Sequence, residues 1–488
     1  MSISGAISSA LSGLAANGRQ LSVTSGNIAN ALTEGFGARD VTLSARSEGG
    51  GVRVVSVGRS LDPALTGLRR EADADAAEAS VLAEGTARLS DAFGVLGGPL
   101  PGLFEQMTAF ENALSALADT PESAPRQGAV LEAAQRLATG FNDASRAAAS
   151  VREDADTQIG DLVRRTNAAT EEVAALNRAI VRSDATGRET AALVDRRETL
   201  IDEISATLPV RVTPQDDGSV TLRTAEGVFL AGLNAREIAF TPTPVIGPEM
   251  VYDNGAGALS GLSVAGVDIT PGGPGAQSVR GGALAGAFAL RDTVATDFAA
   301  GLDALAEELV TRLADPSVDP MLAPGAPGLF TDAGGAPTAP ATPGIAGRLA
   351  VNAAVDPSQG GELFRLRDGI GAAAPGPVSD DSVPRGLIDV LKVAAPFPGA
   401  TAAPGTLSLS NRIAALGEAA ATARVAADTD LSAASAARGA LAGEEAALLG
   451  VDTDRELQKL IEIEQAYAAN ARVISTAEAM LDELRRIG

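Results

Sequence analysis

The sequence contains no His, no Cys and no Trp, and these absences exclude most common catalytic and metal-binding chemistries. Without His, the chain lacks the side chain that titrates near neutral pH and the commonest metal ligand. Without Cys, it has no thiol nucleophile, disulfide, zinc finger or iron–sulfur ligand. Its two Lys residues, Lys392 and Lys459, lie in neither a phosphate-binding loop nor an SxxK motif. We therefore expect a protein that is not an enzyme, with no catalytic residue, no metal site and no cofactor.

Basic residues are also scarce, which bears on the partners of the protein. The 38 Lys and Arg residues stand against 62 Asp and Glu residues, a formal net charge of −24. No basic stripe is available to neutralise phosphates, so we expect no nucleic-acid partner. An anionic membrane surface would repel the chain. The sequence contains no run of about 18 apolar residues free of Gly and Pro, so it predicts no membrane span. Residues 1–18 lack the basic segment of a cleavable signal peptide.

Aromatic residues make up 3% of the 488 residues, so Ala, Leu, Val and Ile must form most of the core. This composition favours close contacts between helices. The length predicts two to four domains. The 54 Gly and 26 Pro residues predict many turns and irregular connections as well.

The first helix is predicted at residues 2–31, where apolar residues recur at steps of three and four. This heptad pattern is typical of a helix that packs along a partner helix. Its polar face holds mostly Ser, Asn and Gln, so the helix should be weak alone. A turn-rich segment at 32–51 and a short strand at Val52–Val57 follow. The apolar row of this first helix consists of Ile3, Ile7, Leu14, Leu21 and Ile28.

The last helix, predicted at 453–487, mirrors the first. Thr453–Glu456 has the sequence of a capping box. Each terminal helix carries an Asn near the middle of its row, Asn17 and Asn470, and buried Asn pairs can fix register in such contacts. We expect the two helices to pack together; the alternative is that each covers a separate core and the Asn residues are incidental. The apolar row of the last helix consists of Leu460, Ile463, Tyr467, Ile474, Leu481 and Leu484.

Between the ends, the pattern predicts long helices followed by strands and loops. Helices are expected at 60–94, 101–118 and 121–206, with a break at Gly187 that makes an antiparallel hairpin or bundle of long helices. The fold class is α+β and multidomain: long terminal helices that form a coiled-coil-like domain, a long helical middle and an outer β-rich domain. The expected segments are a terminal helix with turns at 1–60, a long-helix bundle at 61–208, a β-rich domain at 209–290, a helix with a loop-rich region at 291–405, and C-terminal helices that pair with the first helix at 406–488.

Motifs at both ends resemble those of the bacterial flagellar axial proteins of the rod, hook and hook–filament junction. The N-terminal motif comprises Ala10–Leu14 and Asn27–Phe36, and the C-terminal motif is Gln465–Ile474 with Met480 and Leu481 beyond it. Phe36 stands where the family usually has Tyr, so a hydroxyl is lost and the ring is kept. The middle of the chain resembles the hook-associated protein 1 family in four segments, Val173–Ile180, Leu193–Ser205, Gly281–Asp292 and Leu349–Gly361.

The resemblance implies a structural protein of the bacterial flagellum, secreted through the flagellar type III apparatus. Such a protein forms an adaptor ring of identical subunits at the hook–filament junction, with hook protein on one side and a second junction protein or the filament on the other. It polymerises through its terminal helices, so both apolar rows are the expected assembly interface. The helices are expected to be largely unordered in the free chain, where Ile474, Leu481 and Leu484 are the expected docking residues for a cytoplasmic export chaperone.

Three other interpretations remain. Another axial subunit of the rod or hook shares the end motifs but lacks the helical middle. A secreted coiled-coil adhesin fits the long helices and the acidity, but makes the end motifs a coincidence. An enzyme that uses a carboxylate pair is the least favoured. Asp195 or Glu198 could be named for that role, but charged residues on an amphipathic helix usually belong to its solvated face.

Overall fold

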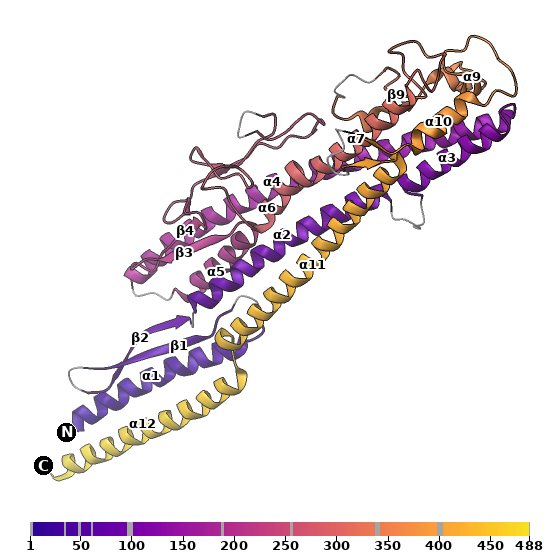
Figure 1. Cartoon of the computed structure of the whole chain (residues 1–488). Helices are drawn as coiled ribbons and strands as arrows, with labels where there is room; N and C mark the ends of the chain where they lie inside the picture. Colours follow the sequence, from indigo (N-terminus) through magenta and orange to yellow (C-terminus); the bar gives the residue numbers. More distant parts are fainter. Residues whose placement is uncertain are drawn as a thin grey trace. The chain divides into compact units, whose positions relative to one another are not determined.

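The computed structural model describes residues 3–33, 36–46, 50–59, 62–94, 101–186, 190–253, 257–336, 342–397 and 404–487. The chain forms two compact units, each built from segments that are far apart in the sequence. The first unit contains Met1–Ala76, Arg164–Ile238 and Ala433–Gly488, and the second contains Ala77–Val163 and Ala239–Ser432. Three long helices have residues in both units: α2 (Pro63–Phe93), α4 (Ala124–Ala185) and α11 (Leu409–Leu449) (Figure 1).

Long helices dominate the described residues, which confirms the predicted fold class. The other long helices are α1 (Ile3–Ala29), α3 (Leu103–Asp119), α5 (Ala191–Thr207) and α12 (Thr453–Ile487). The helix predicted to run from residue 121 to the break at Gly187 is α4, which has 62 residues. The break expected at Gly187 lies outside the described residues.

In the first unit, α1 lies beside α12, and the two helices run antiparallel. The N-terminal end of α1 therefore lies near the C-terminal end of α12 (Figure 1). A hairpin of β1 (Arg39–Ala45) and β2 (Val52–Arg59) follows α1 and contacts it. The two strands are antiparallel, with a bulge between Thr42 and Leu43. The predicted strand at residues 52–57 is therefore confirmed, and it has a partner strand that the sequence pattern did not reveal.

The same unit holds a small antiparallel sheet of order β3-β4-β5. Its strands are β3 (Val210–Pro214), β4 (Val220–Thr224) and β5 (Phe229–Ala231), and β6 (Ile238–Ala239) follows. A hairpin joins β3 to β4 at the start of the segment predicted to be β-rich, and Gly218 in its turn has the positive φ of 79° that such a turn favours.

Buried Asn side chains on α4 attach this part of the chain to the helix. Asn177 donates to the carbonyls of Val220 and Gly232, at 2.8 and 2.9 Å, and accepts the Val220 N–H at 3.1 Å. Asn167 makes a reciprocal pair of 2.9 Å bonds with the backbone of Ile238. Because an amide offers both donor and acceptor, it can replace a missing strand at a sheet edge. Asn177 belongs to one of the four middle motifs, which gives that motif a structural role.

The second unit is helical at its centre and carries short elements around it. Helix α6 (Gly282–Ala289) continues through a π-helical turn at Leu290–Val294 into α7 (Ala295–Leu313). We expected the helix to begin at 291, so this prediction was wrong by nine residues. Gly281 and Gly282 have positive φ and form the turn before α6, while the small residues that follow gave no clear helical period.

The remaining elements of the second unit are short, as the loop-rich composition of 316–405 predicts. They are β7 (Ser263–Val264), β8 (Val267–Asp268), β9 (Phe330–Asp332), α8 (Ile345–Arg348), β10 (Leu349–Val351), α9 (Arg365–Asp368), α10 (Ser382–Lys392), β11 (Ala395–Pro396), β12 (Thr406–Leu407), and the 3₁₀ turns Ala353–Val355 and Pro357–Gln359.

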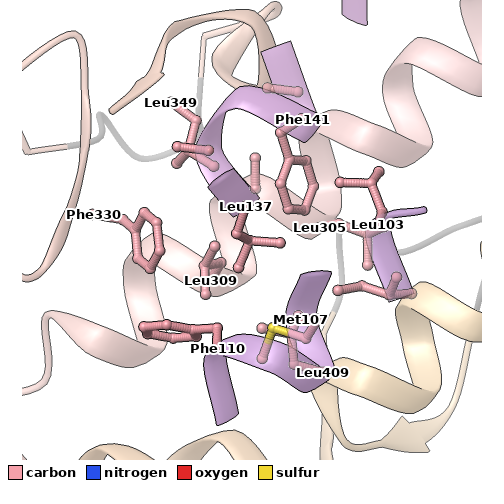
Figure 2. Close-up of a cluster of buried hydrophobic side chains, with 14 of the residues drawn as sticks. Leu103, Met107, Phe110, Leu137, Phe141, Leu305, Leu309, Phe330, Leu349 and Leu409 are labelled. Atoms are coloured by element: carbon pink, nitrogen blue, oxygen red, sulfur yellow. The ribbon is translucent and has the colours of Figure 1, made fainter. Parts of the chain in front are cut away.

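Large apolar side chains form a hydrophobic core in the second unit, part of which is shown in Figure 2. Met107, Phe110 and Phe141 are fully buried there. The rings of Phe110 and Phe330 meet edge to face, with centroids 5.6 Å apart. Each such side chain contributes roughly 1.5–3 kcal/mol through burial, which makes this core the main stabilising feature of the unit.

A buried ion pair accompanies that core. Arg291 donates to Asp156 at 2.7 Å, and both side chains are at most 1% exposed. Arg291 also binds Asp292 and the carbonyl of Ser260, while Asp156 accepts the N–H of Thr243 at 2.6 Å. These contacts attach the segment that contains Thr243 and Ser260 to the central helices.

Candidate assembly site of the terminal helices

Helix α1 is built from residues that give it little stability of its own. It has no acidic residue in its first turn and no basic residue in its last, so the helix dipole is not compensated. The side chains it buries are small or polar: Ala10, Ala16, Asn17, Thr24 and Asn27. A helix of this composition depends on contacts with its surroundings.

The two terminal motifs meet where α1 packs against α12. Gly13 of the N-terminal motif faces Asn470 of the C-terminal motif: a Cβ atom at position 13 would lie 2.7 Å from the Asn470 side-chain nitrogen. A side chain at Gly13 would require the Asn470 side chain to move. The contact between α1 and α12 confirms the expectation that the terminal helices pack together, and Gly13 leaves room for the Asn470 side chain.

The two mid-row Asn residues have different surroundings. Asn470 lies against Gly13, whereas Asn17 is buried and its Nδ2 has no hydrogen-bond partner among the described residues. The N-terminus of α12 also differs from the predicted capping box. The cap is Asp452, whose side chain accepts the N–H groups of Asp454 and Arg455, and Thr453 is already helical. An Asp directly before Thr satisfies the same N–H groups, so the pattern was shifted by one residue.

The predicted apolar rows divide into covered and uncovered residues. Ile463 is buried against α1 at 9% exposure. The half-buried members are Ile3, Ile7, Leu14, Ile28, Leu460 and Ile474. The exposed members are Leu21, Tyr467, Leu481 and Leu484, at 39%, 50%, 41% and 57%.

Other exposed apolar side chains on these helices lie outside the predicted rows. They are Leu11, Leu457, Ile461, Val473 and Met480. The heptad count passed over them because it follows a single face of each helix. Their signal in the sequence was an apolar residue next to the row on a helix whose other residues are mostly small or polar.

Polar side chains of α1 fix the hairpin beside it. Asn27 donates to the carbonyl of Arg39 at 2.9 Å and accepts its N–H at 3.1 Å. Ser12 accepts the N–H of Val52 at 3.1 Å. Ser12 and Asn27 both belong to the N-terminal motif, so this motif serves two contacts of α1, one with α12 and one with the hairpin.

The start of α12 is tied to the same hairpin by charge. The Lys459 ammonium lies 3.0 Å from Asp40 of β1 and 3.0 Å from Glu456. Although partial burial acts to lower the pKa of Lys459, the contacts with Glu456 and Asp40 raise it above its ordinary value. Lys459 therefore stays charged and attaches α12 to β1.

Helix α5 carries a row of carboxylates at Asp195, Glu198 and Asp202. Asp195 accepts from Arg39 at 2.6 Å, and Glu198 accepts from Arg70 at 2.9 Å. Asp195 and Glu198 were expected on a solvated face; this was wrong, because their side chains are 16% and 14% exposed and paired with Arg. Their partners come from distant parts of the sequence, which periodicity on α5 alone does not show.

Asp202 and Arg197 complete the contacts around α5. Asp202 accepts from Arg69 and Arg70 of α2, each at 2.7 Å. Arg197 donates to Asn177 and to the carbonyl of Gly218, at 3.2 and 2.9 Å. Burial lowers the pKa of Arg197, in spite of the neighbouring Glu198 that raises it. The motif Leu193–Ser205 thus joins α5 to α2, to α4 and to the hairpins on either side of it.

No group of three or more acidic side chains in the described ranges is arranged to hold a metal ion. Among the same residues, no helix combines the length and the apolar character that crossing a bilayer requires.

Comparison with known proteins identifies three regions of the chain. Residues 90–316 match the family model of the flagellar hook-associated protein FlgK helical domain. Residues 7–36 match the model of the flagella basal body rod protein, and residues 449–487 match the C-terminal model of the flagellar basal body rod FlgEFG proteins.

Relatives with these features have low but consistent identity. Flagellar hook-associated protein 1 of Escherichia coli (strain K12) is 26% identical over 253 residues, which are 49% of this chain and 46% of that protein. The protein of the same name from Bacillus subtilis (strain 168) is 26% identical over 274 residues, 51% of this chain and 54% of that protein. The matched region thus spans about half the length of these relatives.

One solved structure is also similar, that of the flagellar hook junction protein FlgK from Burkholderia pseudomallei. It matches with a TM-score of 0.43 and 22% identity, over 54% of this chain and 46% of that chain. The helical-domain match and the named relatives agree: over about half of its length, the chain is similar to flagellar hook-associated protein 1.

Proposed function

We propose that this protein is a structural component of the bacterial flagellum, an adaptor that joins the hook to the filament and catalyses no reaction. The observation that carries the proposal is the meeting of the two terminal motifs at Gly13 and Asn470 in a chain that also contains the hook-associated helical domain. The names of the relatives associate those proteins with the hook, and their similarity to this chain supports the same location for it.

Polymerisation is proposed to occur through the terminal helices. Their contact covers Ile463 and leaves large apolar side chains exposed, among them Tyr467 and Leu484. Several large exposed apolar side chains on a protein that carries a net charge of −24 favour an interface over free solvation. The occupants we propose are neighbouring copies in a ring, hook protein on one side, and a second junction protein or the filament on the other.

Export through the flagellar type III apparatus is proposed from the similarity to flagellar hook-associated protein 1. In the free chain, Leu481 and Leu484 are exposed near the end of α12, and Ile474 is half-buried beside α1. A cytoplasmic chaperone could receive these three side chains in an apolar groove, provided that the end of α12 separates from α1. The weak composition of α1 supports such a separation before assembly.

Hydrogen exchange on the purified chain tests that separation. We expect rapid exchange over residues 1–40 and 455–488 and protection between about 60 and 315, because the first two ranges lack a large core. Strong protection at both ends would contradict ordering on assembly and leave the adaptor role itself in place.

Gene deletion tests the function as a whole. Deletion should leave hooks visible by electron microscopy but without filaments, with flagellin released into the medium as monomer. Loss of the hook itself would support a rod or hook subunit, the second candidate, which the rod-protein matches at 7–36 and 449–487 favour. Normal filaments would contradict both.

A further inference from the structure

Two arginines from the base of the hairpin converge on one carboxylate of α5. Arg39 begins β1, Arg59 ends β2, and the two residues face each other in the strand register. The Arg39 guanidinium lies 2.6 Å from Asp195 Oδ2, and the Arg59 guanidinium lies 3.6 Å from Asp195 Oδ1. We call these contacts the first arm and the second arm.

The two arms are not equally formed. The first is a charge-assisted hydrogen bond, and the Arg39 guanidinium also lies 4.8 Å from the centre of the Phe36 ring. In the second, Arg59 Nη1 and Asp195 Oδ1 are both buried, and neither has a hydrogen-bond partner among the described residues. A buried donor and acceptor that face each other beyond hydrogen-bond distance are unfavourable as they stand and would gain from a small approach.

Gly37 lies directly against the Arg59 side chain. A Cβ atom at Gly37 would lie 2.0 Å from Arg59 Nε, so Gly37 makes room for the Arg59 side chain to cross the chain between α1 and β1. Glycine at this position is therefore a requirement of the second arm.

Helix α5 provides a fixed support for the contact. Asp202 accepts from both Arg69 and Arg70 of α2, and Arg69 also pairs with Glu445 of α11. The carboxylate row of α5 is therefore attached to α2 independently of Asp195. Closure of the second arm would move the hairpin toward α5 and leave α5 where it is.

We propose that Arg39, Arg59 and Asp195 form a two-armed latch between the hairpin and α5, with the first arm closed and the second open in the free chain, and that the second arm closes when the terminal helices pack into an assembly. The trigger rests on the proposed assembly function, whereas the two-armed latch does not. Because the hairpin is also bonded to α1 through Asn27 and Ser12, closure would fix the terminal helices relative to α5.

Hydrogen exchange of the free, full-length chain tests the unequal arms. Arg39→Ala should raise exchange of the described amides of β1 and β2 by about tenfold, because it removes a hydrogen-bonded ion pair. Arg59→Ala should raise it by less than about threefold, since an ion pair without a hydrogen bond contributes little. Arg196→Ala is the matched control: this neighbour on α5 forms an exposed pair with Glu172 and should have no effect on the hairpin. Equal effects of Arg39→Ala and Arg59→Ala would overturn the open second arm.

A longer carboxylate tests whether the second arm can close. Asp195→Glu extends the side chain by about 1.5 Å, enough for one carboxylate to reach both guanidinium groups. Exchange over β2 should fall by roughly threefold or more, and Arg59→Ala in the same background should remove that gain. Gly37→Ala, which displaces Arg59, should remove it as well. No decrease in exchange with Asp195→Glu would overturn the capacity to close.

Exchange measured on polymerised protein separates this inference from the proposed function. Assembly should slow exchange over β2, and Arg59→Ala should now raise it about as much as Arg39→Ala does. Polymers without this change would overturn the trigger and leave the adaptor function standing. A chain that does not polymerise would contradict both the adaptor function and the trigger, while the free-chain variants would still decide whether the two-armed latch exists.

Discussion

The core of the second unit and the contact between α1 and α12 are formed by different kinds of side chain. Phe110, Phe141 and Phe330 are fully buried in the first of these regions. The terminal helices hold one aromatic residue between them, Tyr467, and it is half exposed. Their contact uses small and polar side chains such as Ala10, and Ile463 is its single large buried apolar residue among those described.

This difference separates two sources of stability. A core of Phe, Leu and Met gains most of its burial within one chain and needs no partner. A contact of Ala, Gly and Asn brings two helices close together but removes little apolar surface from water. The exposed leucines beside it can be covered only by another molecule. The second unit therefore buries its large apolar side chains within the chain, whereas the terminal helices keep exposed apolar side chains that the proposed assembly would cover.

The largest effect should come from breaking the core. Phe110→Ala removes a fully buried ring that packs against Phe330 and should lower the free energy of unfolding by about 3–5 kcal/mol. Denaturant unfolding monitored by far-ultraviolet circular dichroism measures it. Tyr467→Ala is the matched aromatic control and should change stability by less than about 0.5 kcal/mol, because its ring is half exposed. Equal losses of unfolding free energy in the two variants would contradict the difference between the core and the terminal helices.

The buried ion pair should come next. Asp156→Ala leaves Arg291 buried without one of its two carboxylates and should lower the free energy of unfolding by about 3 kcal/mol, the low end for such pairs because Asp292 remains. Asp154→Ala is the control two residues away on α4. Its exposed pair with Arg88 should contribute less than about 1 kcal/mol. Denaturation curves of the two variants, measured under the same conditions, give this difference in the free energy of unfolding.

A smaller effect is expected where the first unit has a buried polar contact. Asn177→Ala removes the amide that binds the backbone of Val220 and Gly232 and leaves those groups unpaired, a loss of about 2 kcal/mol. Asn411→Ala, at an exposed position of α11, should be neutral. Exchange of the β4 amides should rise in the first variant alone. Unchanged exchange would show that another group replaces the amide.

Periodicity in the sequence located the long helices because heptad spacing depends on neighbouring residues. It found α1 and α12 and the row that contains Ile463. It did not predict which members of that row are covered, since exposure depends on the partner helix and on where that helix ends. Leu481 and Leu484 have the same spacing as Ile463 but are exposed near the end of α12.

Contacts between charged residues were not predictable in the same way. Arg39 and Asp195 are 156 positions apart, and neither has a local pattern that names its partner. The Asp195 side chain was expected to be solvated because that is the usual state of charge on an amphipathic helix. The helix start at Gly282 was missed for another reason: a run of Ala and Gly shows no apolar period.

The stability that Asp356 contributes to the second unit, in the motif Leu349–Gly361, should depend on pH. Hydrogen bonds from Gln359, Ser358 and Gln135 lower the pKa of Asp356, with the Gln359 contact the strongest cause. The charged form is therefore favoured in the folded chain. Its contribution is complete above the ordinary Asp pKa of about 3.9 and is lost as pH falls through the lowered value. Asp356→Asn should make that contribution independent of pH. Unfolding curves between about pH 6 and pH 3 should therefore converge for the two proteins.

The smallest effect on stability should come from the exposed end of α12. Leu484→Ser changes a side chain that is 57% exposed, so the free energy of unfolding of the isolated chain should change by less than about 0.5 kcal/mol. Its effect on assembly should be far larger, because at an interface the same side chain leaves water completely, a difference of roughly 1.5–3 kcal/mol for each copy. Sedimentation of polymerised protein measures assembly, and denaturation of the dilute chain measures stability. Val378→Ser, at a similarly exposed position of the second unit, should alter neither. If Leu484→Ser destabilised the isolated chain as much as it weakened assembly, the end of α12 would be part of an intramolecular core, and the distinction between the two regions would fail.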